Sequence, residues 1–298
     1  MITARTRLTL LSLPIALAML ASACSSTSNA DSPATSTTEV PAPTTTEAPT
    51  TTAAPTTTAA PTTTAAPTTT VAPVPTIPSR VETIAPLAQQ LTAVGKKSGE
   101  ATKLIQSRLT ELGFWAGAID GQYGFATTQA VMAFQKYVGI PTSGVADAGT
   151  VFMLQGWNER AHGSANTGTL VEVDKTKQLL FIIQDGRTVW TMNTSTGSEI
   201  PYESPNKKDP TKIEKGDAVT PNGLYKTNRE RPEGWWEGDL GKIYRPKYFR
   251  GGIAIHGMTS VPDHPASHGC VRLSTQAMDF IWDKNLVPIG MPVWVHGG

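Results

Sequence analysis

The stretch "IAIHGMTSVPDHPASHGCVRL", Ile253 to Leu273, contains Cys270, one of only two cysteines in the 298-residue chain. A thiol is a weak nucleophile until it loses its proton, and a neighbouring imidazole can accept that proton. Two histidines are candidates for this role. His268 precedes the cysteine by two residues, so an extended backbone would place both side chains on one face. His256 ends an expected strand and reaches Cys270 only through folding.

Gly269, between His268 and Cys270, lets the backbone approach a substrate closely. The amide N–H groups of Gly269 and Cys270 are then candidate donors to a developing oxyanion. A lone buried cysteine is more often a small apolar side chain. Here the flanking Ser267, His268 and Gly269 are poor core neighbours. The pattern therefore favours a reactive thiol.

A zinc site is the alternative for the same stretch. Its ligands would come from His256, His264, His268 and Cys270, which are all of types that bind zinc. Pro262 and Pro265 flank His264, however, so His264 cannot share a helix face with His268. We predict a cysteine site that uses no metal and no other cofactor.

The surrounding residues predict a mainly β domain with one main helix over 168–298. The expected strands, from apolar runs or apolar–polar alternation, are 169–173, 178–184, 188–194, 224–227, 242–244, 252–255 and 293–296. Asp185-Gly186 predicts a tight hairpin turn. The helix is expected at 275–285, with Ser274 as its cap. The polar insert Lys226–Arg250 holds Trp235-Trp236, which either form a lid over a substrate or pack on the sheet.

A small three-helix unit is predicted at 97–156, joined to the β domain by a linker at 157–167. Apolar residues recur at helical spacing over 103–112 and 127–138. Asp147 can cap a third helix that carries Val151 and Leu154. Trp115, between the first two helices, either covers the core of the unit or contacts a ligand.

The N-terminus has the pattern of a secretory signal peptide at 1–23. Arg5 and Arg7 precede an apolar run, Leu8–Leu20, and small residues follow it. The run is shorter than the roughly 20 residues that span a bilayer. Cys24 comes directly after the small residues, as in bacterial lipoproteins, although ordinary cleavage also fits. We expect lipidation of Cys24, an anchor at the outer face of the cytoplasmic membrane or in the cell wall, and a free thiol at Cys270.

Residues 24–96 read as a disordered tether rich in Thr, Pro and Ala. Thr44 to Pro73 is five copies of Thr-Thr-Thr-x-Ala-Pro, too poor in large apolar residues to fold. A short helix is possible at 87–94, within the part treated as linker. The chain has a formal net charge of +1 and no basic cluster, so the sequence gives no support for nucleic-acid binding.

Residues 104–154 resemble a peptidoglycan-binding domain 1 module. The resemblance rests on Leu104-Ile105-Gln106, Gly113-Phe114, Ile119-Asp120-Gly121, Tyr123-Gly124, Thr128, Ala130-Val131, Phe134-Gln135 and Thr142-Ser143-Gly144. It implies noncatalytic binding of cell-wall peptides.

Residues 169–298 resemble the L,D-transpeptidase catalytic domain, also called the YkuD domain. The resemblance rests on His256-Gly257, Ser267-His268-Gly269-Cys270-Val271-Arg272, Ser195-Thr196-Gly197 and Thr220-Pro221-Asn222-Gly223. Two features depart from the family pattern. The loop from His256 to Ser267 is shorter than usual, and Arg272 stands where many members have Asn.

The resemblance implies a role for each matched residue. Cys270 is the nucleophile and His256 the general base, while His268, Ser267 and the Gly269 backbone shape the site and its oxyanion hole. Arg272 is implied to contact the substrate or to brace the loop. Gly257 and Tyr248 are implied to contact the substrate, with Tyr244 as an alternative to Tyr248. Carbapenem-type inhibitors are implied to acylate Cys270.

The implied reaction joins peptidoglycan stem peptides. Cys270 attacks a stem tetrapeptide, D-Ala leaves, and the amine of a neighbouring stem resolves the thioester into a 3→3 crosslink. One alternative is an L,D-carboxypeptidase, in which water resolves the same acyl-enzyme. The others are a nonenzymatic wall-binding lipoprotein and a zinc amidase.

Overall fold

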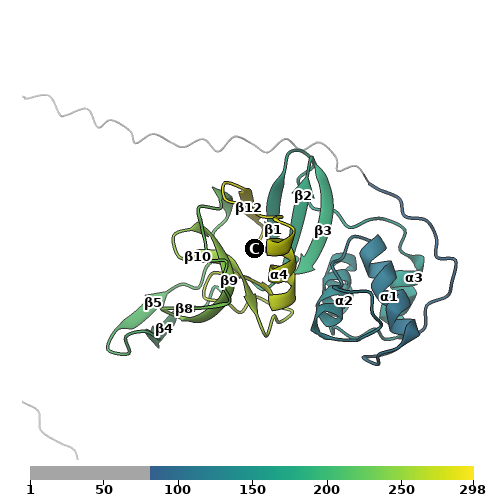
Figure 1. Ribbon diagram of the computed structural model, residues 1–298, viewed down its shortest axis with the longest axis horizontal. Helices are drawn as coiled ribbons and strands as arrows, with labels where there is room; N and C mark the ends of the chain where they lie inside the picture. Colours follow the sequence, from purple (N-terminus) through teal and green to yellow (C-terminus); the bar gives the residue numbers. More distant parts are fainter. Residues whose placement is uncertain (1–80) are drawn as a thin grey trace, which may run out of the picture. The chain divides into compact units, whose positions relative to one another are not determined.

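The computed structural model describes residues 81–298 (Figure 1). The expected signal peptide, Cys24 and the Thr/Pro repeats lie outside these residues. The described residues belong to one compact unit. Within them, no helix combines the length and apolarity needed to cross a membrane.

Three helices form the first part of the described chain. They are α1 Glu100–Glu111, α2 Phe125–Val138 and α3 Ala148–Gly156. Asp147 caps α3, as the sequence predicted, by accepting a hydrogen bond from the Thr150 N–H at 2.8 Å. Gly139 ends α2 with φ +75°, a left-handed conformation that favours glycine. A shared apolar core, which includes Leu109, Phe134 and Leu154, lies between the helices.

The tether was predicted to run to residue 96, and the structure corrects this boundary. Leu91 is only 6% exposed, and its N–H donates to the Gln155 side chain at 2.7 Å. The Ile84 N–H donates to the Asn158 carbonyl at 2.7 Å. No helix forms at 87–94. The apolar residues that suggested one instead lie along an irregular segment that covers the helical core.

The core sheet follows the order β3-β2-β1-β12-β6. Its strands are β1 Leu170–Asp174, β2 Leu179–Gln184, β3 Arg187–Asn193, β6 Gly223–Lys226 and β12 Pro292–His296. Asp185 and Gly186 both have positive φ, 50° and 77°, which is the hairpin turn that the sequence predicted between β2 and β3.

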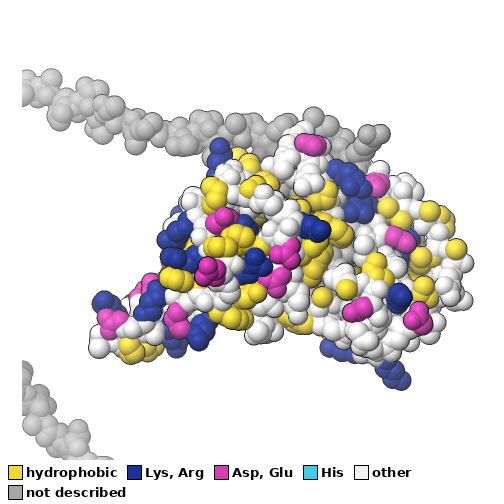
Figure 2. Space-filling model, viewed as in Figure 1, with side chains coloured by type: hydrophobic (Ala, Val, Ile, Leu, Met, Phe, Trp, Pro, Cys, Tyr) yellow, Lys and Arg dark blue, Asp and Glu magenta, His cyan; other side chains and the backbone are white. Residues whose placement is uncertain are grey.

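The site sheet follows the order β11-β10-β9-β7, with β8 paired to β9. Its strands are β7 Arg229–Glu230, β8 Trp235–Gly238, β9 Gly241–Arg250, β10 Ile253–Met258 and β11 Val271–Ser274. A separate hairpin joins β4 Tyr202–Pro205 to β5 Ile213–Gly216. Figure 2 shows Lys and Arg interspersed with Asp and Glu over this hairpin. Strands β4, β5, β7, β8 and β11 are not among those expected from the sequence.

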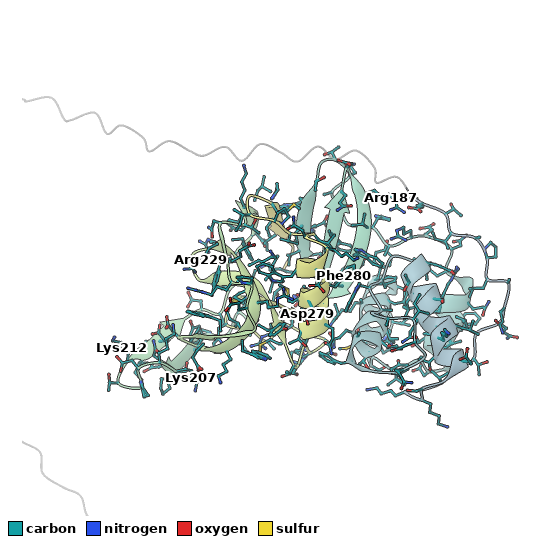
Figure 3. All side chains as sticks on the ribbon, viewed as in Figure 1. Arg187, Lys207, Lys212, Arg229, Asp279 and Phe280 are labelled. Atoms are coloured by element: carbon teal, nitrogen blue, oxygen red, sulfur yellow. The ribbon has the colours of Figure 1, made fainter. Side chains whose placement is uncertain are left out.

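Helix α4, Thr275–Asp283, packs on the site sheet and closes the β core. The Ser274 side chain accepts from the Ala277 N–H at 3.1 Å, which confirms the predicted cap. Phe280 and Asp279 of α4 appear in Figure 3. Phe280 contacts Trp190 of β3 edge to face, with ring centroids 5.5 Å apart. Asp279 accepts a hydrogen bond from the Tyr244 hydroxyl at 2.9 Å, so Tyr244 faces α4.

The segment after α1 joins the helical part directly to the edge strand β3. The Trp115 N–H donates to the Thr191 carbonyl at 3.1 Å, and the Thr191 N–H donates to the Gly113 carbonyl at 2.8 Å. The Lys136 ammonium of α2 donates to the carbonyls of Gln178 and Thr194, both at 3.2 Å. Backbone pairing of this kind extends the core sheet with residues from the helical part.

Residues 157–167, predicted to be a linker, reinforce this junction. The Arg160 guanidinium donates to the carbonyls of Glu111 and Val189, at 2.9 and 2.8 Å, and so ties α1 to β3. Ala161 is 1% exposed, and Gly163 donates its N–H to the Thr188 hydroxyl at 3.0 Å. The segment is therefore packed between the two parts.

Replacing Trp115 with alanine should destabilise the whole described unit. The indole is 9% exposed and lies in the core of the β domain, 5.4 Å from the Phe280 ring, so it is not free to contact a ligand. Loss of a buried Trp side chain costs about 3–5 kcal/mol of unfolding free energy. We expect one cooperative denaturant transition, measured by circular dichroism, with a lower midpoint. Trp235→Ala, at a 46% exposed residue, is the matched control and should shift the midpoint much less. Two separate transitions would contradict this account of the junction.

Candidate active site

The register of the site sheet places the central residues on one face. β10 and β11 are parallel, with His256 paired to Arg272 and Ile255 paired to Val271. Side chains alternate along a strand, so Cys270 shares its face with Arg272. His256, Arg272 and Cys270 all line a pocket of about 490 Å³ on this face. Strand pairing thus brings the histidine that is far away in sequence into the pocket that holds the thiol.

The loop before β11 is fixed by hydrogen bonds around Cys270. The Ser267 hydroxyl donates to the Cys270 carbonyl and accepts from the Gly269 N–H at 3.0 Å. Gly269 has φ +124°, and a Cβ there would lie 2.8 Å from the Val219 carbonyl oxygen. Glycine is therefore required at this position. Because its N–H is already bonded to Ser267, Gly269 is not the free oxyanion donor that the sequence suggested, and the Cys270 amide is the remaining candidate.

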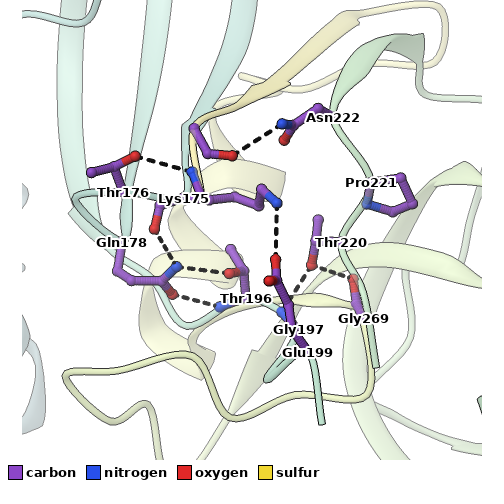
Figure 4. A network of polar contacts seen from close by, with 12 residues as sticks. Lys175, Thr176, Gln178, Thr196, Gly197, Glu199, Thr220, Pro221, Asn222 and Gly269 are labelled. Carbon is purple, nitrogen blue, oxygen red and sulfur yellow. Dashed lines mark hydrogen bonds and ion pairs between the residues drawn. The ribbon is translucent and has the colours of Figure 1, made fainter. Parts of the chain in front are cut away.

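The two upstream motifs hold this loop in place (Figure 4). The Thr220 hydroxyl donates to the Gly269 carbonyl at 2.7 Å and accepts from the Gly197 N–H at 2.8 Å. Ser195 bonds through its backbone N–H and C=O to Arg272, at 3.3 and 3.0 Å. A Cβ on Gly197 would meet the Ala218 oxygen at 2.0 Å, so this close approach also requires glycine. Both motifs act on the site through its backbone.

His256 is a buried imidazole, only 2% exposed. Burial lowers its pKa to about 4, with the Arg272 charge acting in the same direction and the Gly257 carbonyl acting against both. Its Nδ1 lies 3.1 Å from that carbonyl oxygen, a contact that selects the tautomer with the proton on Nδ1. At neutral pH the imidazole is therefore uncharged, and the lone pair on Nε2 is available to accept a proton.

Cys270 is a free, half-buried thiol. Burial raises its pKa, although the Ala254 N–H and the Arg272 guanidinium both favour the thiolate. The Sγ atom lies 3.8 Å from the Gly252 carbonyl oxygen. Since the thiol pKa is raised and the His256 pKa is lowered, the pocket at neutral pH holds a neutral thiol and a neutral imidazole. Transfer of the thiol proton must accompany attack.

The remaining predicted residues divide between the pocket and the core. His268 is exposed and packs edge to face on Tyr202, with ring centroids 4.5 Å apart. The extended backbone that would align it with Cys270 does not form, because of the conformation of Gly269. Both His268 and Tyr248 line the pocket.

Gly257 does not line the pocket, in contrast to the implied substrate contact. It follows His256 along β10 and therefore faces the opposite side of the sheet. A Cβ there would lie 3.0 Å from both the Thr275 Cα and the Tyr244 ring. A side chain at Gly257 would therefore crowd the contact between the sheet and α4. Tyr244 faces the same side, so of the two tyrosines considered from the sequence only Tyr248 lines the pocket, which Tyr202 also lines.

His264, considered above as a zinc ligand, is exposed, and its Nδ1 lies 2.7 Å from the Asp263 carboxylate. Within residues 81–298, no group of three or more His, Cys, Asp or Glu residues is arranged to hold a metal ion.

Sequence reasoning missed the basic wall of the pocket. Lys208, from the β4–β5 hairpin, and Arg229, Arg231 and Trp236, from the insert, all line it. Arg229 is marked on the site sheet in Figure 3. The insert carried no motif, and its only signal was the pairing of aromatic and basic residues. The two insert tryptophans alternate along β8. Trp236 lines the pocket, whereas Trp235 is 46% exposed and contacts Tyr244.

Stability should fall on acidification because His256 is buried uncharged. An unfolded imidazole titrates near pH 6.5, whereas burial lowers the folded pKa to about 4. The unfolded state therefore binds more protons between these values, and the contribution of His256 is lost as pH falls through this window. The full difference corresponds to about 3 kcal/mol. We therefore compare the unfolding free energies of the wild type and His256→Gln at each pH. The advantage of the wild type over the variant should decrease by about 3 kcal/mol between pH 7 and pH 4. A pH-independent difference would contradict the buried neutral state.

Two family models match the chain. The YkuD model of the L,D-transpeptidase catalytic domain matches residues 168–295, and the PG_binding_1 model of a peptidoglycan binding domain matches residues 98–154. Among solved structures, the L,D-transpeptidase from Xylanimonas cellulosilytica is 40% identical, with a TM-score of 0.61. That similarity covers 71% of this chain and 100% of the other.

Curated relatives match over shorter stretches. The spore cortex-lytic enzyme of Bacillus cereus is 40% identical over 72 residues, which are 24% of this chain and 28% of that protein. The N-acetylmuramoyl-L-alanine amidase CwlM of Mycobacterium tuberculosis is 31% identical over 67 residues, which are 22% of this chain and 16% of that protein. The matches thus span less than a third of either relative.

Proposed function

Because this chain belongs to the L,D-transpeptidase family, we propose that it is a peptidoglycan-modifying enzyme in which Cys270 is the nucleophile. The observation that supports the proposal is that this half-buried thiol and a buried, uncharged imidazole line the same pocket. The substrate is a peptidoglycan stem tetrapeptide that ends in D-Ala. The matched PG_binding_1 region supports a target in the wall, and we propose that residues 97–156 bind wall peptides without catalysis.

The first half-reaction forms a thioester. His256 Nε2 accepts the Cys270 proton as Sγ attacks the carbonyl that precedes D-Ala, and the negative charge moves to the carbonyl oxygen. The Cys270 amide is the backbone donor for that oxyanion. When the tetrahedral intermediate collapses, the C–N bond breaks and the imidazolium returns its proton to the amine of the departing D-Ala. The low pKa of His256 makes its imidazolium a strong acid for this step.

The second half-reaction consumes the thioester. An amine of a neighbouring stem attacks the carbonyl, gives its proton to His256, and displaces the Cys270 thiolate, which recovers that proton. The product is a 3→3 crosslink. Water in place of the amine would give the carboxypeptidase reaction through the same residues.

Incubation with purified wall fragments, followed by mass spectrometry of the products, tests the function. We expect release of D-Ala and a crosslinked dimer whose amount depends on an acceptor amine. Trimmed tripeptide alone, even with excess acceptor, would support the carboxypeptidase. If the fragments were recovered unchanged and Cys270 carried no adduct, the result would support the alternative of a nonenzymatic wall-binding protein.

We further propose that the protein is exported and anchored by lipid on Cys24, with residues 24–80 as the tether. The support is the sequence pattern of residues 1–24 and the Thr/Pro repeats. Cys24→Ala should move the protein from the membrane fraction to the soluble exported fraction. Equal membrane retention of this variant would count against the anchor.

A further inference from the structure

Arg231 is a cation without a protein partner in the pocket wall. Its Nε atom is buried and makes no hydrogen bond, and Arg231 forms no ion pair within residues 81–298. Its guanidinium carbon lies 3.5 Å from the centre of the Trp236 ring, so the planar group is held in place by stacking. The terminal nitrogens of the guanidinium also have no hydrogen-bond partner within residues 81–298 and are not among the buried atoms, so their N–H groups can bind a ligand. The geometry therefore suggests that Arg231 is reserved for an anion.

The neighbouring charges do not neutralise it. Lys208 also lies against Trp236, with Nζ 5.7 Å from the ring centre. The two pocket acids are both engaged elsewhere. Asp239 pairs with Lys208 at 3.1 Å, and Glu214 accepts from the Asn206 amide at 2.7 Å. Basic residues outnumber these acids among the lining residues, which include Lys208, Arg229, Arg231, Lys242 and Arg272. The pocket as a whole therefore favours a negatively charged ligand.

Strand pairing places Arg231 on the face that carries Cys270, but well away from it. Arg229 of β7 pairs with Tyr248 of β9, which in turn pairs with Ala254 of β10. The Arg231 N–H continues this ladder by donating to the Pro246 carbonyl at 3.0 Å. From β7 to β11 there are three strand spacings, or about 14 Å. An extended peptide covers that distance in about four residues, and the long arginine side chain shortens the span.

We propose that Arg231, oriented by Trp236, binds a carboxylate of the donor stem peptide that is remote from the bond attacked by Cys270. A guanidinium recognises a carboxylate through two parallel hydrogen bonds, which a carboxamide cannot reproduce. The site would therefore select donors in which this group is a free acid. The inference rests on the proposed function, since it assumes a stem-peptide donor.

Acylation kinetics with synthetic stem tetrapeptides test the proposal. Each carboxylate remote from the scissile bond is replaced in turn by a carboxamide, and the Cys270 acyl-enzyme is followed by intact-protein mass spectrometry. We expect one of these replacements to raise KM about tenfold to hundredfold with kcat nearly unchanged, as for the loss of a charge-assisted hydrogen bond. Arg231→Gln should raise KM for the free acid by a similar factor and remove the discrimination between acid and amide. For Arg231→Lys and Trp236→Leu, both the KM and the discrimination between acid and amide should lie between the values of the wild type and of Arg231→Gln.

Arg250→Gln is the matched control. Arg250 lies on β9 of the same sheet, is exposed and does not line the pocket, so its loss should change neither KM nor the discrimination. Equal KM values for acid and amide forms in the wild type overturn the proposal without any variant. So does unchanged discrimination in a folded Arg231→Gln protein. If the wild type acylates normally in either case, the transpeptidase function stands and only the role of Arg231 fails. If the wild type forms no acyl-enzyme with any tetrapeptide, both fall together.

Discussion

Replacing Cys270 with alanine is expected to abolish acyl-enzyme formation. No other cysteine lies within residues 81–298, and His256 lines the pocket that holds this thiol. Without sulfur there is no atom on which to build the thioester. Intact-protein mass spectrometry should show a mass increase on the wild type after exposure to a stem tetrapeptide or a carbapenem. The variant should show none, and D-Ala release should fall to background.

The fold of the variant must be intact for this result to count. Cys270 is half-buried beside a backbone network that does not depend on its side chain, so the thermal midpoint should change little. A persistent adduct on Cys270→Ala, or wild-type rates of D-Ala release, would overturn the mechanism. If the wild type formed an adduct with the carbapenem but not with tetrapeptides, Cys270 would be confirmed as the reactive thiol and the proposed substrate would be wrong.

Replacing His256 with glutamine should lower the acylation rate at pH 7 by about 10²- to 10⁴-fold, the usual contribution of a general base. The amide can still contact the Gly257 carbonyl, but it cannot accept the thiol proton. Because the thiol pKa is raised by burial, few molecules carry a thiolate at neutral pH. The variant should therefore recover activity as pH rises, whereas the wild type already has its base unprotonated above pH 4. Single-turnover kinetics from pH 5 to pH 10 would measure both profiles.

His264→Gln provides the matched control. This histidine lies between β10 and β11, is exposed and does not line the pocket. Its replacement should leave the acylation rate and the pH profile unchanged. A His256→Gln enzyme with near-wild-type rates at pH 7 would show that another group removes the thiol proton.

Much of the β architecture could be predicted because burial leaves a strong signal in sequence. Strands β1 and β2 are almost continuously buried, and their apolar residues mark them clearly. Strands β4, β5 and β8 could not be found in this way. Their residues are half-buried and exposed in alternation, because one side faces a solvated pocket or water. The polar composition there reflects the pocket, and local hydrophobicity does not reveal it.

The choice of base shows the same limit. Spacing along the chain favours His268, whereas the pairing of β10 with β11 brings His256 to the thiol. The family resemblance implied His256 as the general base, and this residue does line the pocket. A resemblance carries information about strand register that spacing along the chain lacks. It implied substrate contact for Gly257 as well, and the alternation of β10 places that residue on the opposite face. Arg231 was missed because its role depends on stacking and burial, which no local pattern encodes.

The junction at β3 has a further consequence for how the enzyme would select its substrate. The backbone bonds of Trp115 and Thr191, together with Arg160 and Lys136, join the helices to the core sheet without an intervening flexible linker. A wall strand held by the helical part would therefore meet the Cys270 pocket at a constant offset. The distance between the helical part and the pocket would then determine which of the many identical stem peptides along the strand reacts.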